Sequence, residues 1–369
     1  MLKKDNFFKN YFINLSKYNQ NLKKTKKVFS SFIVDLKNNQ IPLLKSYEKN
    51  YEFDFSATTV KKFSKYRNIV VIGMGGSILG TKSIYSFLKK RIKKEVFFFD
   101  NLDLNLSLKY KKIKNLKNSC FIIVSKSGNT LETITNLGTI FSENLLKNKL
   151  IIITEITDNA LMAIANKYNA EIIEHKEFIG GRYSVLSETG MFPAALMGLN
   201  LMKFKNLKRL INNKNFISSL IQNVASIHTL NSKKINNSVI LNYDSNLNDL
   251  GYWYQQLVAE SLGKKGKGIN PILSFGPKDH HSLLQLYLDG PKDKFFTFFN
   301  SSKRENKLKV ARGIIPNNMG FLINKNLEFI INAQCNATKN IFKLKKIPFR
   351  QITFNKKNED ELGEIFTFF

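Results

Sequence analysis

The chain has 369 residues, of which 43% are hydrophobic, and this length and apolar content suit two globular domains better than one. No run of about 18 consecutive apolar residues occurs. The N-terminus lacks the apolar core and cleavage site of a secretory signal. The two cysteines, Cys120 and Cys335, exclude a disulfide framework and fit a reducing compartment. We therefore expect a cytoplasmic protein without a membrane partner.

The formal net charge of +30 has two explanations. It could mark a protein that binds nucleic acid or an anionic surface, or it could reflect a composition rich in lysine and asparagine. The second is favoured, because basic clusters such as Lys23–Lys27 are short and scattered. No basic arm interleaved with aromatic residues is present, and no zinc-finger spacing. We expect no nucleic-acid partner, although the charge would steer an anionic substrate toward the protein.

The first half of the chain alternates between short apolar strands and helices. Residues 1–50 are predicted to form a helical extension, with polar turns near its end. A first domain is predicted over residues 51–215, with strands at 67–72, 95–99, 120–124, 150–154 and 170–173. Helices are predicted after the first and third of these strands, and this alternation is typical of a doubly wound parallel sheet.

A second alternation fills residues 216–369, which we predict to be a second domain of the same kind. Its strands are expected at 239–243, 294–299 and 350–354, and its helices at 248–262, 281–288 and 326–342. The predicted fold is therefore α/β, with two doubly wound parallel sheets in three-layer α/β/α arrangements behind a helical N-terminal extension.

A glycine-rich turn follows the first predicted strand. The segment Gly73–Gly80 lets the backbone approach an anion, and the helix after it offers free N–H groups, so a phosphate-binding turn is one interpretation. A dinucleotide site is a second interpretation, supported by Asp100 at the end of the next strand. The G-x-G-x-x-G spacing fails, however, because Ile78 stands at the last glycine position. The third interpretation is a tight turn that binds no ligand.

A polar segment follows the third predicted strand. Ser125, Lys126, Ser127 and Thr130 place three hydroxyl groups and an amine where open α/β sheets bind ligands. Such groups suit the oxygens of a phosphate. The alternative is an ordinary loop that caps the next helix. Because the glycine-rich turn belongs to the same sheet, we favour a shared phosphate site.

Two charged residues are candidates for chemistry on a bound substrate. Arg182 follows Gly180 and Gly181 and could stabilise an oxyanion, or it could be a surface arginine in a turn. Glu260 is predicted in the last turn of the 248–262 helix, where the helix dipole disfavours a carboxylate. It could act as a general base, or it could simply pair with Lys264 four residues on.

Two of the chain's four histidines, His280 and His281, are adjacent at a predicted helix start. A helix N-terminus favours the neutral imidazole, which suits acid–base chemistry on a hydroxyl group. Solvated or capping histidines are the alternative. Zinc binding is disfavoured, because adjacent histidines on a helix point in different directions and no third ligand lies at a familiar spacing.

Five segments together resemble the glucose-6-phosphate isomerase family, in the family's order and roughly its spacing. They are GMGGSILG (73–80), SKSGNTLET (125–133), GGRYSVLS (180–187), QQLVAESLGK (255–264) and GPKDHHSLLQLYLDG (276–290). The resemblance covers about residue 50 to the C-terminus. It implies two sugar-isomerase (SIS) domains and the interconversion of glucose 6-phosphate and fructose 6-phosphate through a cis-enediol intermediate.

The resemblance also implies a role for each matching residue. Glu260 corresponds to the base that moves a proton between C1 and C2, Arg182 to the residue that stabilises the enediolate, and His281 to the ring-opening histidine. The positions that match substrate-binding residues are Gly76, Ser77, Ser125, Lys126, Ser127, Thr130 and Gln256. No metal and no organic cofactor is implied.

Two further expectations come from the resemblance. In this family the histidine reaches the site from a partner subunit, so a homodimer is implied. Family members continue past residue 369 with a helix whose lysine assists ring opening, and this chain ends in what looks like an interrupted helix with exposed phenylalanines. We therefore expect a C-terminally truncated form with weak or no activity. A non-catalytic sugar-phosphate-binding protein is the alternative.

Overall fold

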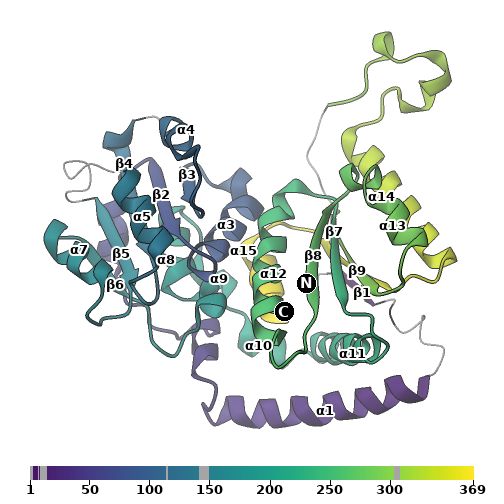
Figure 1. Cartoon of the computed structure of the whole chain (residues 1–369), viewed down its shortest axis with the longest axis horizontal. Helices are drawn as coiled ribbons and strands as arrows, with labels where there is room; N and C mark the ends of the chain where they lie inside the picture. The colour runs from purple at the N-terminus through teal and green to yellow at the C-terminus, as the bar shows by residue number, and fades with distance from the viewer. Residues whose placement is uncertain (1–2, 7, 9–14, 114, 141–148, 303–307) are drawn as a thin grey trace.

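A computed structural model of the chain describes residues 3–6, 8, 15–113, 115–140, 149–302 and 308–369. Two five-stranded sheets stand side by side, with helices around and between them (Figure 1). This arrangement confirms the predicted α/β class with two parallel sheets.

The first sheet is entirely parallel and has the strand order β3-β2-β4-β5-β6. Its central strands β2, β4 and β5 are buried along their whole length, so they consist of nearly continuous apolar runs rather than alternating ones. All five predicted strands are confirmed to within a residue: β2 (Asn68–Gly73), β3 (Glu95–Phe99), β4 (Ser119–Val124), β5 (Leu150–Thr154) and β6 (Glu171–Glu174).

The second sheet has the order β1-β10-β9-β7-β8, in which β1 alone runs antiparallel to its neighbour. The three predicted strands and three predicted helices are present, with shifted ends in most cases. The sequence prediction missed two strands, β1 and β8. The elements are β1 (Lys3–Asn6), β7 (Asn237–Asn242), β8 (Asn270–Phe275), β9 (Lys294–Ser301), β10 (Phe349–Phe354), α12 (Asn248–Leu262), α13 (Leu284–Asp289) and α14 (Leu327–Leu344).

The N-terminal extension is only partly helical. Helix α1 (Leu15–Lys37) packs along α11 (Lys214–Asn231), and Asn21 Nδ2 donates a hydrogen bond to Thr229 Oγ1 at 2.9 Å (Figure 1). The preceding β1 pairs with β10 through Lys3↔Thr353 to Asn6↔Arg350. The prediction of a helical extension was therefore wrong for residues 3–6, because backbone pairing with a distant strand determines their structure.

Helices α3 (Gly76–Leu88) and α12 pack against each other between the two sheets. Helix α15 (Glu359–Phe368) packs there too, against α3 and α9 (Leu201–Phe204). The phenylalanines at the end of the chain are not exposed as expected: Phe366 and Phe368 are 2% and 5% exposed. Phe366 lies against Trp253 with ring centroids 4.7 Å apart, a contact that no local pattern in the sequence could reveal.

The remaining helices surround the sheets. They are the α-helices α2 (Ala57–Ser64), α4 (Leu106–Lys111), α5 (Leu131–Ile140), α7 (Ala160–Tyr168), α8 (Glu188–Leu196) and α10 (Leu207–Ile211), and the 3₁₀ turns η2 (Pro42–Tyr47), η3 (Lys89–Arg91), η4 (Leu116–Asn118), η5 (Gly181–Leu186), η6 (Ser245–Leu247), η7 (Lys278–His280), η8 (Arg312–Ile314) and η9 (Asn317–Leu322). Among the described residues, none of the helices combines the length and the apolar character needed to cross a bilayer. The same residues contain no group of three or more His, Cys, Asp or Glu side chains placed to hold a metal ion.

Candidate active site

The glycine-rich turn brings three distant segments together by close backbone approach. Gly75 has a φ of +52°, a conformation that side chains disfavour. A Cβ atom on Gly75 would lie 2.7 Å from Gln256 Nε2, and one on Gly76 would lie 2.2 Å from the carbonyl oxygen of Gly181. The turn after β2, the segment around Arg182 and helix α12 therefore meet where only glycine leaves room.

Arg182 and Glu260 form an ion pair at this meeting point. Arg182 Nη1 donates to Glu260 Oε1 at 2.7 Å, and Gln256 Nε2 donates to Glu260 Oε2 at 3.2 Å. Glu260 lies in the last turn of α12, as predicted, and its side chain is 51% exposed, so its carboxylate is accessible to a ligand. Lys264 is not among its ion-pair partners. The structure thus brings together Gly76, Arg182, Gln256 and Glu260.

Two residues that the sequence prediction did not select complete this cluster. Ser261 Oγ accepts a hydrogen bond from Arg182 Nε at 2.9 Å and lies 2.9 Å from Tyr183 Oη. The Arg182 guanidinium also lies over the Tyr183 ring, 4.6 Å from its centroid. Burial alone would raise the pKa of Tyr183, but the hydrogen bond to Ser261 and the nearby Arg182 outweigh it and lower the pKa. Tyr183 directly follows Arg182 and Ser261 directly follows Glu260, and this adjacency is the only signal in the sequence for either residue.

The predicted phosphate-binding residues lie along the carboxyl edge of β2 and β4. The register pairs Gly73 with Val124, so the first turn of α3, which carries Ser77, lies beside the loop that starts at Ser125. In that loop Ser125 Oγ and Thr130 Oγ1 are 2.7 Å apart, and Ser127 is exposed. The hydroxyl groups are therefore grouped at one edge of the first sheet.

Lys126 leaves this group and reaches toward the loops after β5 and β6. Its Nζ donates to the carbonyl oxygen of Glu177 at 2.6 Å and lies 3.4 Å from Glu155 Oε1. An anion at the loop would compete with Glu155 for the amine. Binding of a phosphate by Lys126 therefore remains a prediction.

His281 is not part of the Arg182–Glu260 cluster within one chain. It is exposed at the end of η7, and the α-helix predicted from 281 begins only at Leu284. Within the described residues, its imidazole has no hydrogen-bonding partner. The neighbouring His280 is held instead: its Nε2 lies 2.7 Å from Tyr243 Oη and 3.3 Å from Thr338 Oγ1. Burial first, and then the charge of His281, lower the pKa of His280, which favours the neutral ring.

Asp100, the residue that kept a dinucleotide site open, is bound within the protein. Lys82 Nζ lies 2.5 Å from Asp100 Oδ2 and 3.6 Å from Asp249 Oδ1. Burial alone would lower the pKa of Lys82, but these two carboxylates outweigh it and raise the pKa. The carboxylate of Asp100 is thus engaged by an amine, which argues against a ribose-binding role.

Comparison with known proteins decides the family. The family model described as "Phosphoglucose isomerase" matches residues 37–275, a stretch that contains Gly76, Arg182, Gln256 and Glu260. The chain belongs to the phosphoglucose isomerase family. Among its relatives, a glucose-6-phosphate isomerase of Methanocaldococcus jannaschii is 35% identical over 85% of this chain and 79% of the relative. One of Campylobacter jejuni is 32% identical over 74% of this chain and 70% of the relative.

Solved structures show the fold of this family member independently. A hypothetical protein from Thermus thermophilus superposes with a TM-score of 0.79 at 20% identity, covering 100% of this chain and 92% of the other. A glucose-6-phosphate isomerase from Chlamydia trachomatis superposes with a TM-score of 0.63 at 18% identity, covering 85% and 65%. Both likenesses support the paired α/β sheets that hold the candidate site.

Proposed function

We propose that the chain reversibly isomerises D-glucose 6-phosphate and D-fructose 6-phosphate, as part of glycolysis and gluconeogenesis in the cytoplasm. The observation that carries the proposal is the Arg182–Glu260 pair, with Gln256 on the same carboxylate, beside the glycine turn. In the proposed division of labour, residues 51–215 supply the phosphate-binding loops. Residues 216–369 supply Glu260 and His281.

The chemistry needs one base that takes a proton from one carbon and returns it to the next. The accessible carboxylate of Glu260 suits this role. When C2 of the aldose loses its proton, negative charge develops on the C1 oxygen, and Arg182 is the cation adjacent to the base. A proton then passes from the C2 hydroxyl group to the C1 oxygen, and Glu260 returns its proton to C1, which gives the ketose with its carbonyl group at C2. The base ends in its starting state, so the step requires no external oxidant or reductant.

A remote phosphate group would position the reacting carbons. Ser77, Ser127 and Thr130 offer hydroxyl groups at the carboxyl edge of the first sheet, with Gly76 at the start of α3. Ser125 is 1% exposed and would act through its hydrogen bond with Thr130. Binding energy from this anchor can be used to align C1 and C2 with Glu260. Lys126 would contribute charge once an anion draws it from Glu155.

Ring opening is assigned to His281, which would have to come from a second copy of the chain. Its exposed position, outside the Arg182–Glu260 cluster of its own chain, supports a homodimer with shared active sites. A second support is the segment from 308 to 326, which extends away from the second sheet (Figure 1). Leu308, Ile314 and Phe321 on this segment are 71%, 84% and 66% exposed, and exposed apolar groups of this kind mark contact surfaces.

The test is turnover of fructose 6-phosphate by the purified chain, with glucose 6-phosphate followed through a coupled dehydrogenase. Glu260→Gln keeps the hydrogen-bonding shape but removes the base, so kcat should fall by about 10²–10⁴-fold. Sugar-phosphate binding should persist, because the phosphate loops are unchanged.

Equal turnover by both proteins would overturn the assignment of Glu260. No turnover by either, with sugar-phosphate binding retained, would favour the alternative of a non-catalytic sugar-phosphate-binding protein. Chromatography with light scattering would test the homodimer separately, and a monomer with full activity would contradict the shared site.

A further inference from the structure

A second pocket lies away from the candidate active site, between the end of α1, the turn η2 and helix α10. Its volume is about 770 Å³, within the range of small-molecule sites. Five cationic residues line it, against the single acid Glu48: Lys37, Lys49, Lys205, Lys208 and Arg209.

Most of this positive charge is not neutralised by the protein. Within the described residues, Lys37, Lys49 and Lys208 make no ion pair, and each is exposed. Arg209 Nε donates to the neutral Asn206 Oδ1 at 3.2 Å. Four asparagines and the apolar side chains of Ile33, Leu36, Leu207 and Ile211 complete the lining. Cations around an apolar wall suit a ligand that carries an anionic group on a less polar body.

One of the lining cations, Lys205, is buried, and its amine is held by the protein, so the charge offered to a ligand comes from the exposed cations. Lys205 is 1% exposed, and its Nζ donates a hydrogen bond, at 2.8 Å, to the carbonyl oxygen of Ser46. The amine lies 4.3 Å and 4.2 Å from the ring centroids of Tyr51 and Phe53, and among the described residues no carboxylate is within ion-pair distance of it. Burial lowers the pKa of Lys205 to about 7, although the buried carboxylate of Glu188 already favours its charged form.

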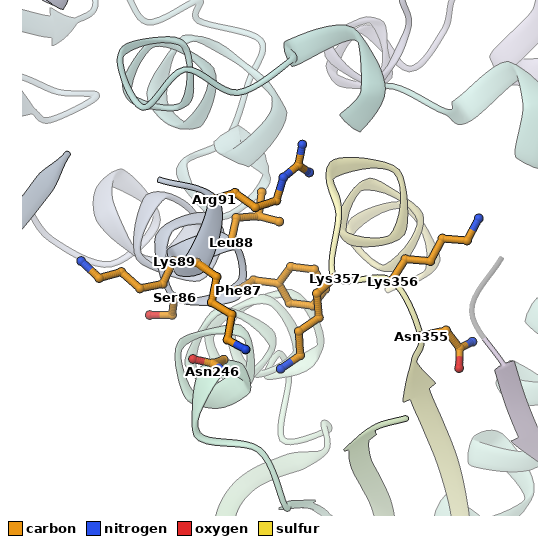
Figure 2. A pocket seen from close by; sticks show the side chains of 10 residues that line it. Ser86, Phe87, Leu88, Lys89, Arg91, Asn246, Asn355, Lys356 and Lys357 are labelled. Atoms are coloured by element: carbon orange, nitrogen blue, oxygen red, sulfur yellow. The ribbon is translucent and has the colours of Figure 1, made fainter. Parts of the chain in front are cut away.

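A comparable pocket at the junction of the two sheets lacks these properties. It is lined by Lys89, Arg91, Lys356 and Lys357 among others, with a volume of about 330 Å³. Arg91 pairs with Glu359 and Lys357 with Asp244, and Figure 2 shows Arg91 and Lys356 extending away from Lys357 and Asn246. Its cations are therefore largely paired with carboxylates or extend away from the other lining residues. The exposed cations of the α1–α10 pocket have no such carboxylate partners among the described residues.

We propose that the pocket between α1 and α10 binds a small phosphorylated molecule, separately from the isomerase site. The phosphate would be held by the exposed cations Lys49, Lys208 and Arg209 of the pocket lining. Charge-assisted hydrogen bonds of this kind are the strong ones. The concave shape with an apolar wall favours a small molecule over an extended polyanion.

The test is calorimetric titration of the full chain with pyrophosphate at about 150 mM salt, where distant surface charges are screened. The pair Lys49→Ala with Lys208→Ala should weaken binding at least about tenfold, as expected when two charge-assisted hydrogen bonds are lost. The matched pair Lys24→Ala with Lys27→Ala removes the same charge from exposed positions of α1 that do not line the pocket. It should leave the affinity unchanged.

A further variant separates this site from the isomerase site. Ser127→Ala, in the loop after β4, should leave pyrophosphate binding to the pocket intact. The proposal is overturned if pyrophosphate does not bind, if both lysine pairs weaken it equally, or if only Ser127→Ala weakens it. Because binding is measured without turnover, failure of the isomerase assignment would not affect the result.

Discussion

The parallel strands of the two sheets end in loops that differ in what occupies them. In the first sheet, the loop after β4 presents Ser127 and Thr130, and no carboxylate of the described residues accepts a hydrogen bond from its backbone. In the second sheet, the loop after β10 is filled by the protein itself. Glu361 accepts from the backbone N–H groups of Asn355, Lys356 and Lys357 at 2.8, 3.1 and 3.0 Å.

The second sheet therefore contains an anion-binding loop whose anion is its own side chain. Glu361 is 3% exposed and lies in the first turn of α15, where a carboxylate suits the helix dipole. The loop after β7 is closed in a similar way, because Asp244 bonds the backbone of Asn246 and pairs with Lys357. Topology alone thus does not make a ligand site; the backbone donors at the strand ends must also be left for the ligand.

After the loss of the base in Glu260→Gln, the largest expected effect comes from disturbing the close approach around Gly76. In Gly76→Ala the new Cβ would lie 2.2 Å from the Gly181 carbonyl oxygen, so the segment carrying Arg182 must move. A displacement of about 1 Å at a catalytic group can cost about 100-fold in rate, so kcat/KM for fructose 6-phosphate should fall by about that factor. The matched control is Gly138→Ala on α5, where a Cβ meets nothing within 4 Å. Activity of Gly76→Ala within about tenfold of the parent would contradict this account.

The second prediction compares one variant in each sheet. The variant in the second sheet should mainly lose stability, and the variant in the first sheet should mainly lose substrate binding. Glu361→Ala removes the buried carboxylate that accepts from three backbone donors, which should lower the free energy of unfolding by about 2–3 kcal/mol in urea titrations. Thr130→Val removes only the contact with Ser125, so it should cost less than about 1 kcal/mol but raise KM for the sugar phosphate. Equal losses of stability would remove the distinction between a filled loop and an open one.

The regular parts of both sheets could be predicted from the sequence because their signals are local. Strands β3 and β5 and helix α12 have the predicted bounds, since apolar runs and a glycine C-cap mark them directly. Strand β8 was missed because Pro271 argues against a central strand; it is in fact an edge strand, where proline is tolerated. Strand β1 has the sequence KKDN, whose polar residues show no strand pattern.

The candidate site was predictable in its residues but not in its contacts. From the sequence, Lys264 was the one partner that could be suggested for Glu260, as an alternative to a role as a base. The structure pairs Glu260 with Arg182, which lies 78 positions away in the chain. Ser261 could not be selected, because its role depends on that pairing. The ion pair of Asp100 with Lys82 likewise depends on how α3 packs beside β3. Such contacts are set by the tertiary fold, which no residue spacing expresses.

The third prediction concerns Ser261, which we expect to position Arg182 rather than to contact substrate. Ser261→Ala removes the acceptor of Arg182 Nε, so kcat should fall by about tenfold while KM changes little. Ser261→Thr retains the hydroxyl group and should restore most of the rate. Tyr183→Phe keeps the ring beneath the guanidinium and should have a smaller effect. A uniform loss in all three variants would indicate a purely structural role.

The smallest expected effect is on how the stability of the second sheet changes with pH, through Asp244 in the loop after β7. Burial alone would raise the pKa of Asp244, but the ion pair with Lys357 and the hydrogen bonds to Asp244 outweigh it, so the pKa lies below the ordinary value. A carboxylate whose pKa is depressed by folding adds stability above its unfolded pKa of about 4, and that stability is lost as pH falls through the folded pKa. Asp244→Asn should therefore be less stable than the parent by about 1 kcal/mol at neutral pH, and this difference should vanish in acid.

The matched control is Asp158→Asn, at an exposed position after β5 without an ion pair among the described residues. Urea titrations from neutral pH down to about pH 2 measure both differences. If the Asp244→Asn difference persisted unchanged in acid, the Lys357 ion pair would not be what closes the second sheet's edge, and the contrast between the two sheets would rest on Glu361 alone.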